Sequence, residues 1–147
     1  MSITSAGTGR PGATTPSALV VSGLTELALG ALSGWVYTAA VKRPDLLRRV
    51  GIGSPARIRQ WHLDLGMLGA YTVVCGLAVP NAPRTVEIAL GIGAWTNAMS
   101  FLPLAFREDL IDRPVYLVPV VGSFVATSVG FTGMALTAWR RRGGSTT

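Results

Sequence analysis

Four long apolar segments, separated by short stretches rich in proline, glycine and charge, dominate the chain. They cover residues 17–41, 62–79, 86–106 and 115–139. A helix needs roughly 20 mostly apolar residues to cross the hydrocarbon core of a bilayer, and each segment is close to that length. The pattern therefore predicts an all-α fold, a four-transmembrane-helix bundle.

The two ends of the chain differ from these segments. Residues 1–16 are rich in Ser, Thr, Gly and Pro and carry one charge, a composition typical of a disordered tail. Segment 17–41 is too long for a removable signal peptide and lacks a small-residue cleavage site before a polar region, so we expect a retained helix. Residues 140–147 start with three arginines and predict a basic, flexible C-terminus. One membrane domain, 17–139, is expected between them.

The composition agrees with a membrane environment. Hydrophobic residues make up 49% of the chain and charged residues 14%, against about 25% charge in soluble domains. The net charge of +6 does not indicate nucleic-acid binding, because the basic residues lie between apolar runs and not along a water-facing surface with stacking aromatics. The single cysteine, Cys75, excludes an intrachain disulfide, and the single histidine, His62, excludes a two-histidine metal motif. We expect Cys75 to be a small core residue.

Basic residues are unevenly divided between the two sides of the predicted bundle. The first and third connections carry eight: Lys42, Arg43, Arg48, Arg49, Arg57, Arg59, Arg107 and Arg113. The opposite side carries five: Arg10, Arg84, Arg140, Arg141 and Arg142. The excess favours cytoplasmic connections and outward termini, although the terminal arginine cluster acts the other way. We expect a multi-pass protein of a bacterial inner membrane.

Small residues recur every three or four positions within the segments, which marks faces where membrane helices approach closely. The stripes are Gly23, Glu26, Gly30 and Gly34; His62, Gly66, Gly69, Val73 and Gly76; and Gly122, Ala126, Gly130 and Gly133. Close packing alone explains the glycines. Two of the stripes also contain an ionisable residue, which packing does not explain.

Glu26 and His62 are these two residues. A carboxylate at the position of Glu26 is costly in hydrocarbon, so we expect it to be protonated or paired, unless the helix begins later and leaves it at the interface. His62 opens the second segment and shares a helical face with Gly66 and Gly69. This face would form a flat wall for a planar macrocycle, with the imidazole as axial ligand. The alternative is an interfacial histidine that is hydrogen-bonded to a headgroup or to backbone.

Other polar residues are candidates for chemistry. Asp64 lies two positions after His62 and points to another side of the helix, where it either orients a neighbour or ends the span. Asn97 lies within the third segment, where an amide must find a hydrogen-bond partner and should therefore face inward. Asn97 and Phe101 are four residues apart and share a face.

The order of these features resembles a family of four-helix membrane isomerases that contains styrene oxide isomerase and hydroxylaminobenzene mutase. The similarity begins with Leu-Ser-Gly-Trp-Val at 32–36 and Lys-Arg-Pro at 42–44. It continues with Arg-Gln-Trp-His-Leu-Asp-Leu-Gly-Met-Leu-Gly at 59–69 and Ala-Trp-Thr-Asn at 94–97, and it covers about 20–139.

The resemblance implies a homotrimer with haem b held between protomers and His62 as axial ligand, beside Gly66 and Gly69. Members of the family use ferric iron as a Lewis acid to rearrange an epoxide, or move a hydroxyl group from nitrogen to an aromatic carbon. By this resemblance Asn97 is a candidate catalytic residue that orients the substrate or a neighbouring helix, and Asp64 is the second candidate.

Three positions that are polar in styrene oxide isomerase are apolar here: Leu68, Gly93 and Phe101. The candidate substrate pocket comprises Met67, Leu68, Trp95, Phe101 and Glu26. It favours a small apolar or aromatic substrate with one oxygen donor, and Asp64 or Glu26 would supply a replacement acid or base.

Three other functions stay open. Loss of the polar positions fits a non-enzymatic haem carrier or accessory subunit of the same fold. An electron-transfer cytochrome needs a second axial ligand, such as Met67, Met99 or a symmetry mate. A transporter would use Glu26 as proton carrier and would have to be an oligomer.

Overall fold

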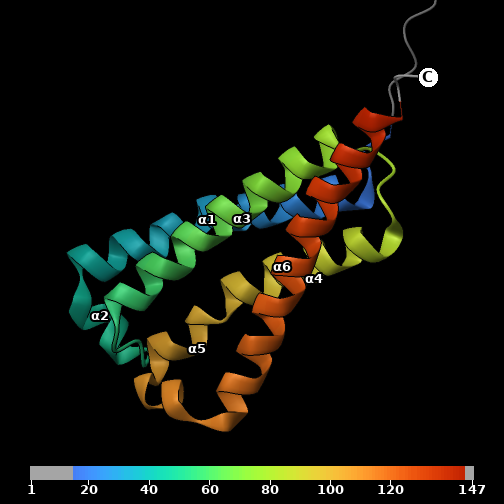
Figure 1. Ribbon diagram of the computed structural model, residues 1–147. Coiled ribbons are helices and arrows are strands. Elements are labelled where there is room, and N and C mark those ends of the chain that lie inside the picture. Colours follow the sequence, from blue (N-terminus) through green and yellow to red (C-terminus); the bar gives the residue numbers. More distant parts are fainter. Residues whose placement is uncertain (1–14, 145–147) are drawn as a thin grey trace, which may run out of the picture.

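A computed structural model describes residues 15–144, and every element in that range is helical (Figure 1). The four long helices are α1 (Ala18–Lys42), α3 (Pro55–Ala78), α4 (Arg84–Met99) and α6 (Pro114–Gly143). The short elements are α2 (Pro44–Arg49), α5 (Phe101–Phe106) and the 3-10 helix η1 (Glu108–Asp112). The prediction of an all-α fold is confirmed.

Three helical stretches are long and apolar enough to cross a bilayer: α1, the combined stretch Arg84–Phe106, and α6. Helix α3, which contains the predicted span 62–79, is not among them. Its N-terminal half includes Arg57, Arg59, His62 and Asp64, and these residues lower its hydropathy. The structure is thus compatible with a multi-pass membrane protein, with α3 as the most polar of the long helices.

The helix ends explain where the predicted boundaries hold and where they shift. Helix α1 begins where expected, because Ser17 caps it and its Oγ accepts from the Val20 N–H at 3.3 Å. Helix α3 begins at Pro55, seven residues before the predicted start, since proline is favoured in a first helical turn. His62 therefore lies two turns inside the helix and does not open it.

The third predicted helix is divided. Helix α4 ends at Met99, and α5 follows after Ser100. Pro103 has no N–H to donate to the Met99 carbonyl, which interrupts the helical hydrogen bonds at this point. The Ser100 hydroxyl donates instead to the Asn97 carbonyl at 2.7 Å.

The last helix is longer than expected. Helix α6 continues through the three arginines to Gly143, so residues 140–143 are helical. The Arg141 guanidinium donates to the carbonyls of Pro80 and Asn81, both at 2.6 Å, which fixes this end against the α3–α4 turn. Residues 1–14 of the predicted tail, and residues 145–147, lie outside the described residues.

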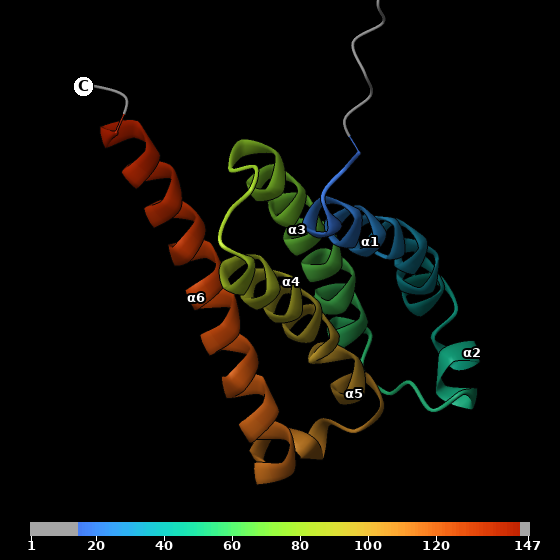
Figure 2. The same cartoon turned by 90° about the vertical axis from the view of Figure 1, so that its right-hand side faces the viewer.

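The long helices form two pairs. Helix α1 packs along α3, and α6 packs along α4, while contacts between α3 and α4 join the pairs. Figure 2 shows α6 on the far side of α4 from α1. Outside its contact with α4, much of α6 is exposed, including Val115, Val118 and Trp139.

Glycines make both pairings close. A Cβ on Gly69 would lie 2.6 Å from the Leu27 nitrogen, and one on Gly23 would lie 2.8 Å from the Gly69 carbonyl oxygen. At the other pairing, a Cβ on Gly130 would collide with the backbone of Leu90. Most glycines of the predicted stripes therefore lie at helix contacts, whereas a Cβ on Gly66 or Gly122 would meet no atom within 4 Å.

Two core clusters occupy opposite ends of the bundle. One gathers Leu47, Ile58, Trp61 and Leu65 near α2 and α5. The other gathers Leu19, Val79, Leu90 and Met134 near the α3–α4 turn. Cys75 is half-buried against the second cluster, in keeping with a packing role.

Candidate functional site

His62 is attached to α1 through one ring nitrogen. Its Nδ1 lies 2.9 Å from the Gly30 carbonyl oxygen and 3.0 Å from the Ser33 Oγ. The Ser33 hydroxyl itself donates to the Gly30 carbonyl at 2.6 Å. A carbonyl only accepts, and the Ser33 proton is already directed to it, so Nδ1 carries the ring proton and donates. In the neutral imidazole Nε2 then carries no proton, and it is in this form that a histidine ligates a metal.

The ring of His62 is held from a second direction. The Tyr37 ring stacks on it, with centroids 5.9 Å apart and planes 14° apart. Gly34 lies under the imidazole, where a Cβ would be 3.3 Å from Cε1. Within residues 15–144, Nε2 has no hydrogen-bond partner. The imidazole is thus oriented by α1 while one nitrogen stays available.

An apolar groove of about 460 Å³ opens beside this histidine, between α1 and α3. Its lining residues are Leu27, Gly30, Ala31, His62, Leu63, Gly66, Met67, Ala70 and Tyr71. A Cβ on Gly66 would meet no atom within 4 Å, so the absence of a side chain there leaves open space. Met67 and Tyr71 are about half exposed, which shows that the groove is open on its outer side.

The donor set of the described residues suits one kind of metal site. Between residues 15 and 144 no group of three or more His, Cys, Asp or Glu side chains is placed to hold a metal ion. A metal that brings its own equatorial ligands, as haem iron does, needs a single protein nitrogen. His62 with its free Nε2, beside an apolar groove, fits that requirement.

Some of the residues predicted for the site share this groove, and others do not. Met67 and Gly66 line it together with His62. Gly69 instead forms the close contact with α1, and Asp64 is half-buried outside the lining. Glu26 is fully buried, with no partner for either carboxylate oxygen in the described part of the chain.

The remaining pocket candidates lie elsewhere. Leu68 and Phe101 pack against the core cluster around Ile58 and Trp61. Asn97 is half-buried on α4. The Trp95 indole N–H donates to the Ser22 Oγ at 2.9 Å. One copy of the chain therefore does not assemble the whole predicted pocket.

Trp95 lines a second, larger groove of about 820 Å³ between α1 and α4. Ser22, Ile92, Thr96, Arg84 and Glu87 are among its other lining residues. Its lining includes no histidine, cysteine or methionine, which are the usual axial donors to haem iron. Its volume therefore does not make it the better candidate for a haem site.

Ser33 and Tyr37 are functional candidates that the sequence pattern does not reveal. Both belong to α1 and reach His62 only because α1 and α3 are paired in one register. Their four-residue spacing, which puts them on one face of α1, is the sole signal in the sequence. The pairing partner of that face is not encoded in any local motif.

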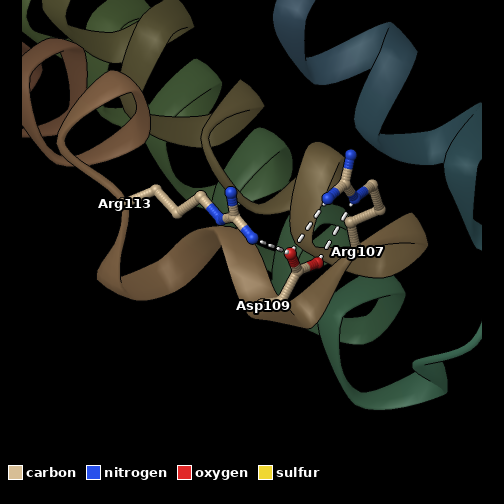
Figure 3. A network of polar contacts seen from close by, with 3 residues as sticks. All are labelled: Arg107, Asp109 and Arg113. Atoms are coloured by element: carbon tan, nitrogen blue, oxygen red, sulfur yellow. Dashed lines mark hydrogen bonds and ion pairs between the residues drawn. The ribbon is translucent and has the colours of Figure 1, made fainter.

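A charged network of Arg107, Asp109 and Arg113 lies at η1 (Figure 3). The Arg107 guanidinium donates to both carboxylate oxygens of Asp109, at 3.3 and 2.9 Å, and Arg113 donates to the second at 3.1 Å. The hydrogen bonds from Arg107 hold the pKa of Asp109 below its usual value. This exposed network fixes the turn between α5 and α6 and takes no part in the groove.

No family model, curated protein or solved structure matches this chain.

Proposed function

We propose that this chain is an integral membrane, haem-dependent isomerase that rearranges its substrate intramolecularly. The observation that carries the proposal is the state of His62. Its Nδ1 is fixed by Gly30 and Ser33, and its Nε2 is free beside an apolar groove with space over Gly66.

His62 would hold haem b as its axial ligand, and Leu63, Met67 and Tyr71 would supply apolar contacts. Bound there, ferric haem supplies a Lewis acid for an oxygen atom of the substrate. The chain's own residues orient the imidazole, keep its proton on Nδ1 and surround the groove with apolar side chains. A hydrogen bond donated by Nδ1, the nitrogen that does not ligate the metal, also raises the basicity of a ligating histidine.

The lining of the groove favours a reaction that exchanges no protons with bulk water. Apart from His62 and Tyr71 it contains no titratable side chain. Conversion of an epoxide to a carbonyl compound, or migration of a hydroxyl group in an arylhydroxylamine, involves no net oxidation and no second substrate. We therefore propose a small apolar or aromatic substrate of one of these two classes.

The proposed assembly is a homo-oligomer in which all four long helices span the membrane. Helix α3 has 24 residues, which corresponds to roughly 36 Å at 1.5 Å per residue, and it packs along α1. Its arginines would lie in the headgroup region. The open side of the groove would be closed by another copy, as in the homotrimer of the family that the motifs resemble.

Asn97 and Asp64 stay candidate catalytic residues under this proposal. Neither lines the His62 groove of its own chain. They would act on a substrate only where a neighbouring copy brings them to the groove. The proposed location is a bacterial inner membrane.

Turnover tests the enzymatic part of the proposal. The full-length protein, purified with haem, is incubated with aryl epoxides and with arylhydroxylamines, and products are separated and weighed by mass spectrometry. The expected product has the mass of its substrate and a different retention time, and the His62→Ala variant forms none. Absence of any isomer from a haem-loaded wild-type protein would contradict the isomerase assignment.

A non-enzymatic haem-binding protein of the same fold is the second candidate. Leu68 and Phe101, which stand at polar positions of styrene oxide isomerase, pack into the core and present no polar group to a substrate. This candidate predicts bound haem, dependent on His62, without turnover of either substrate class.

A further inference from the structure

Glu26 is a polar side chain buried within helix α1. It has no exposed surface, and neither carboxylate oxygen has a hydrogen-bond partner within the described residues. The residues buried on the faces of α3 and α4 include no ionisable side chain. An unpaired carboxylate in such surroundings is unfavourable by several kcal/mol, on the order of the cost of burying any lone charge.

Thr72 is a second orphaned polar side chain at the same contact. It is also fully buried, and its hydroxyl has no partner in the described part of the structure. Buried polar groups in proteins are almost always hydrogen-bonded. Two unpartnered polar side chains at the same helix contact therefore indicate an atom that joins them by hydrogen bonds.

The register of α1 and α3 places these two side chains at one level. A Cβ on Gly23 would lie 2.9 Å from the Val73 nitrogen, so Thr72 stands opposite the turn of α1 that contains Gly23. Side chains on a helix tilt toward its N-terminus, which carries the Glu26 carboxyl toward that same turn. The hydrogen bond from the Trp95 indole N–H to the Ser22 Oγ shows that α4 also lies against this turn of α1.

We propose that Glu26 and Thr72 form an internal proton-binding site, in which Glu26 is a neutral carboxylic acid hydrogen-bonded to the Thr72 hydroxyl, directly or through one water molecule. A protonated carboxyl has a donor and an acceptor, and a hydroxyl has both as well, so the pair satisfies each member. The ligand is the proton, with or without a water molecule. The site is separate from the His62 groove and does not depend on haem.

Infrared spectroscopy of the full-length protein in lipid vesicles at neutral pH tests this site. The wild type should show the carbonyl stretch of a neutral carboxylic acid, which shifts when glutamate is labelled with ¹³C and moves slightly in D₂O. The label separates Glu26 from carboxyl groups of lipid or of any bound cofactor. The band should vanish in Glu26→Gln and persist in Glu108→Gln, which alters an exposed glutamate of η1.

Thr72→Val tests the pairing. Loss of the hydroxyl should move the band to higher wavenumber, because the carbonyl loses a hydrogen bond. The control Thr25→Val alters an exposed threonine of α1, whose hydroxyl donates to the Val21 carbonyl, and should leave the band in place. A wild-type spectrum without a glutamate-dependent neutral-acid band would overturn the proposal even if no variant folds. A Glu26 band that is unmoved in folded Thr72→Val would overturn the pairing.

Discussion

The position of one proton decides what His62 is able to bind. With the proton on Nδ1, held by the Gly30 carbonyl and the Ser33 hydroxyl, the lone pair on Nε2 is free for a metal. With the proton on Nε2, the Gly30 carbonyl would face a second acceptor at 2.9 Å, which is unfavourable. The two short contacts of Nδ1 therefore connect the packing of α1 on α3 to the chemistry of the groove.

Ser33→Ala removes one of the two contacts at Nδ1. Because the Gly30 carbonyl still accepts the proton, we expect haem to bind with affinity lowered by about tenfold, near the lower end for partners of a metal-ligating histidine. Haem titration of the detergent-solubilised protein measures this. The control is Thr38→Val. The Thr38 hydroxyl donates to the Gly34 carbonyl on an exposed part of α1, so its removal should leave the affinity for haem unchanged. Equal affinity of Ser33→Ala and wild type would show that Ser33 does not orient the imidazole.

The sequence identifies the residues of the site that stand out chemically and misses those that act by position. His62 is the single histidine, and Gly66 and Met67 follow it on the same helix, so their association needs no knowledge of the fold. Ser33 and Tyr37 are ordinary residues on another helix, and only the register of the pairing brings them to the imidazole.

Glycines at the helix contacts set the separation of the elements. Gly69→Ala would place a methyl group 2.6 Å from the Leu27 backbone nitrogen, which cannot move without the whole of α1. We expect a loss of about 1–3 kcal/mol in the free energy of unfolding, as for other overpacked positions. Gly130→Ala, at the α4–α6 contact, should behave in the same way. Reversible unfolding in mixed detergent measures both.

Two glycines of the same helices serve as controls. Cβ atoms on Gly66 and Gly122 would meet nothing within 4 Å. Gly66→Ala and Gly122→Ala should therefore match or exceed the wild type in stability, by up to about 1 kcal/mol from helix propensity. Gly66→Ala should still weaken haem binding, because its methyl group enters the groove. Equal losses of stability at all four positions would contradict the packing described here.

The hydrogen bonds of Asp109 make the η1 turn sensitive to acid. Because the pKa of Asp109 is lowered in the folded protein, its contribution to stability is present above the usual Asp value and is lost as the pH falls through the lower folded value. The carboxyl is exposed, so the effect is small. We expect the melting temperature of Asp109→Asn to vary less with pH than that of wild type, between about pH 5 and about pH 2.

Asp112→Asn is the matched control for this turn, because it changes an exposed aspartate of the same short helix. Its pH dependence should resemble that of the wild type. If Asp109→Asn and wild type lose stability in parallel across this range, the network does not support the turn.

Helix existence follows from hydropathy far better than helix ends do. All four apolar segments are helical, yet α3 begins seven residues early and the third segment is divided at Ser100. Hydropathy locates the part of a helix that matches hydrocarbon, whereas Pro55 and Pro103 decide where the backbone hydrogen bonds start and stop. The signals for both ends are present in the sequence, but they are conformational and not hydrophobic.

At the scale of the whole molecule, the basic connections lie at one end. The N–H groups of Gly53 and Ser54 donate to the Ala105 carbonyl, at 2.9 and 3.2 Å, which joins the α2–α3 link to α5. The end of α6 instead binds the α3–α4 turn through Arg141. Eight basic residues therefore cluster near α2, α5 and η1, and the positive-inside rule predicts that this end is cytoplasmic.

Cysteine accessibility tests this orientation. In a Cys75→Ser background, Thr85→Cys marks the α3–α4 end and Asp112→Cys marks the η1 end, both at exposed positions. In spheroplasts, a membrane-impermeant maleimide should label Thr85→Cys and spare Asp112→Cys, and inverted vesicles should give the reverse. The opposite pattern would show that the terminal arginines determine the orientation.

A single copy of the chain leaves part of its surface uncovered, and association with other copies or with lipid covers it. The His62 groove is open on its outer side, and much of α6 is exposed outside its contact with α4. Lipid covers such surfaces as readily as protein does, because membrane helices associate by close packing and not by apolar burial. The residues of the candidate pocket that lie outside the groove would reach it only from a second copy.

An absorption spectrum of the purified protein, oxidised and then reduced, tests the central claim most directly. The full-length wild type, expressed with ample haem, is compared with His62→Ala, and circular dichroism verifies that both are folded. A free Nε2 beside the groove predicts a Soret band with stoichiometric haem in the wild type and loss of that band in His62→Ala. A wild type without a Soret band, or a folded His62→Ala variant with full haem occupancy, would contradict it.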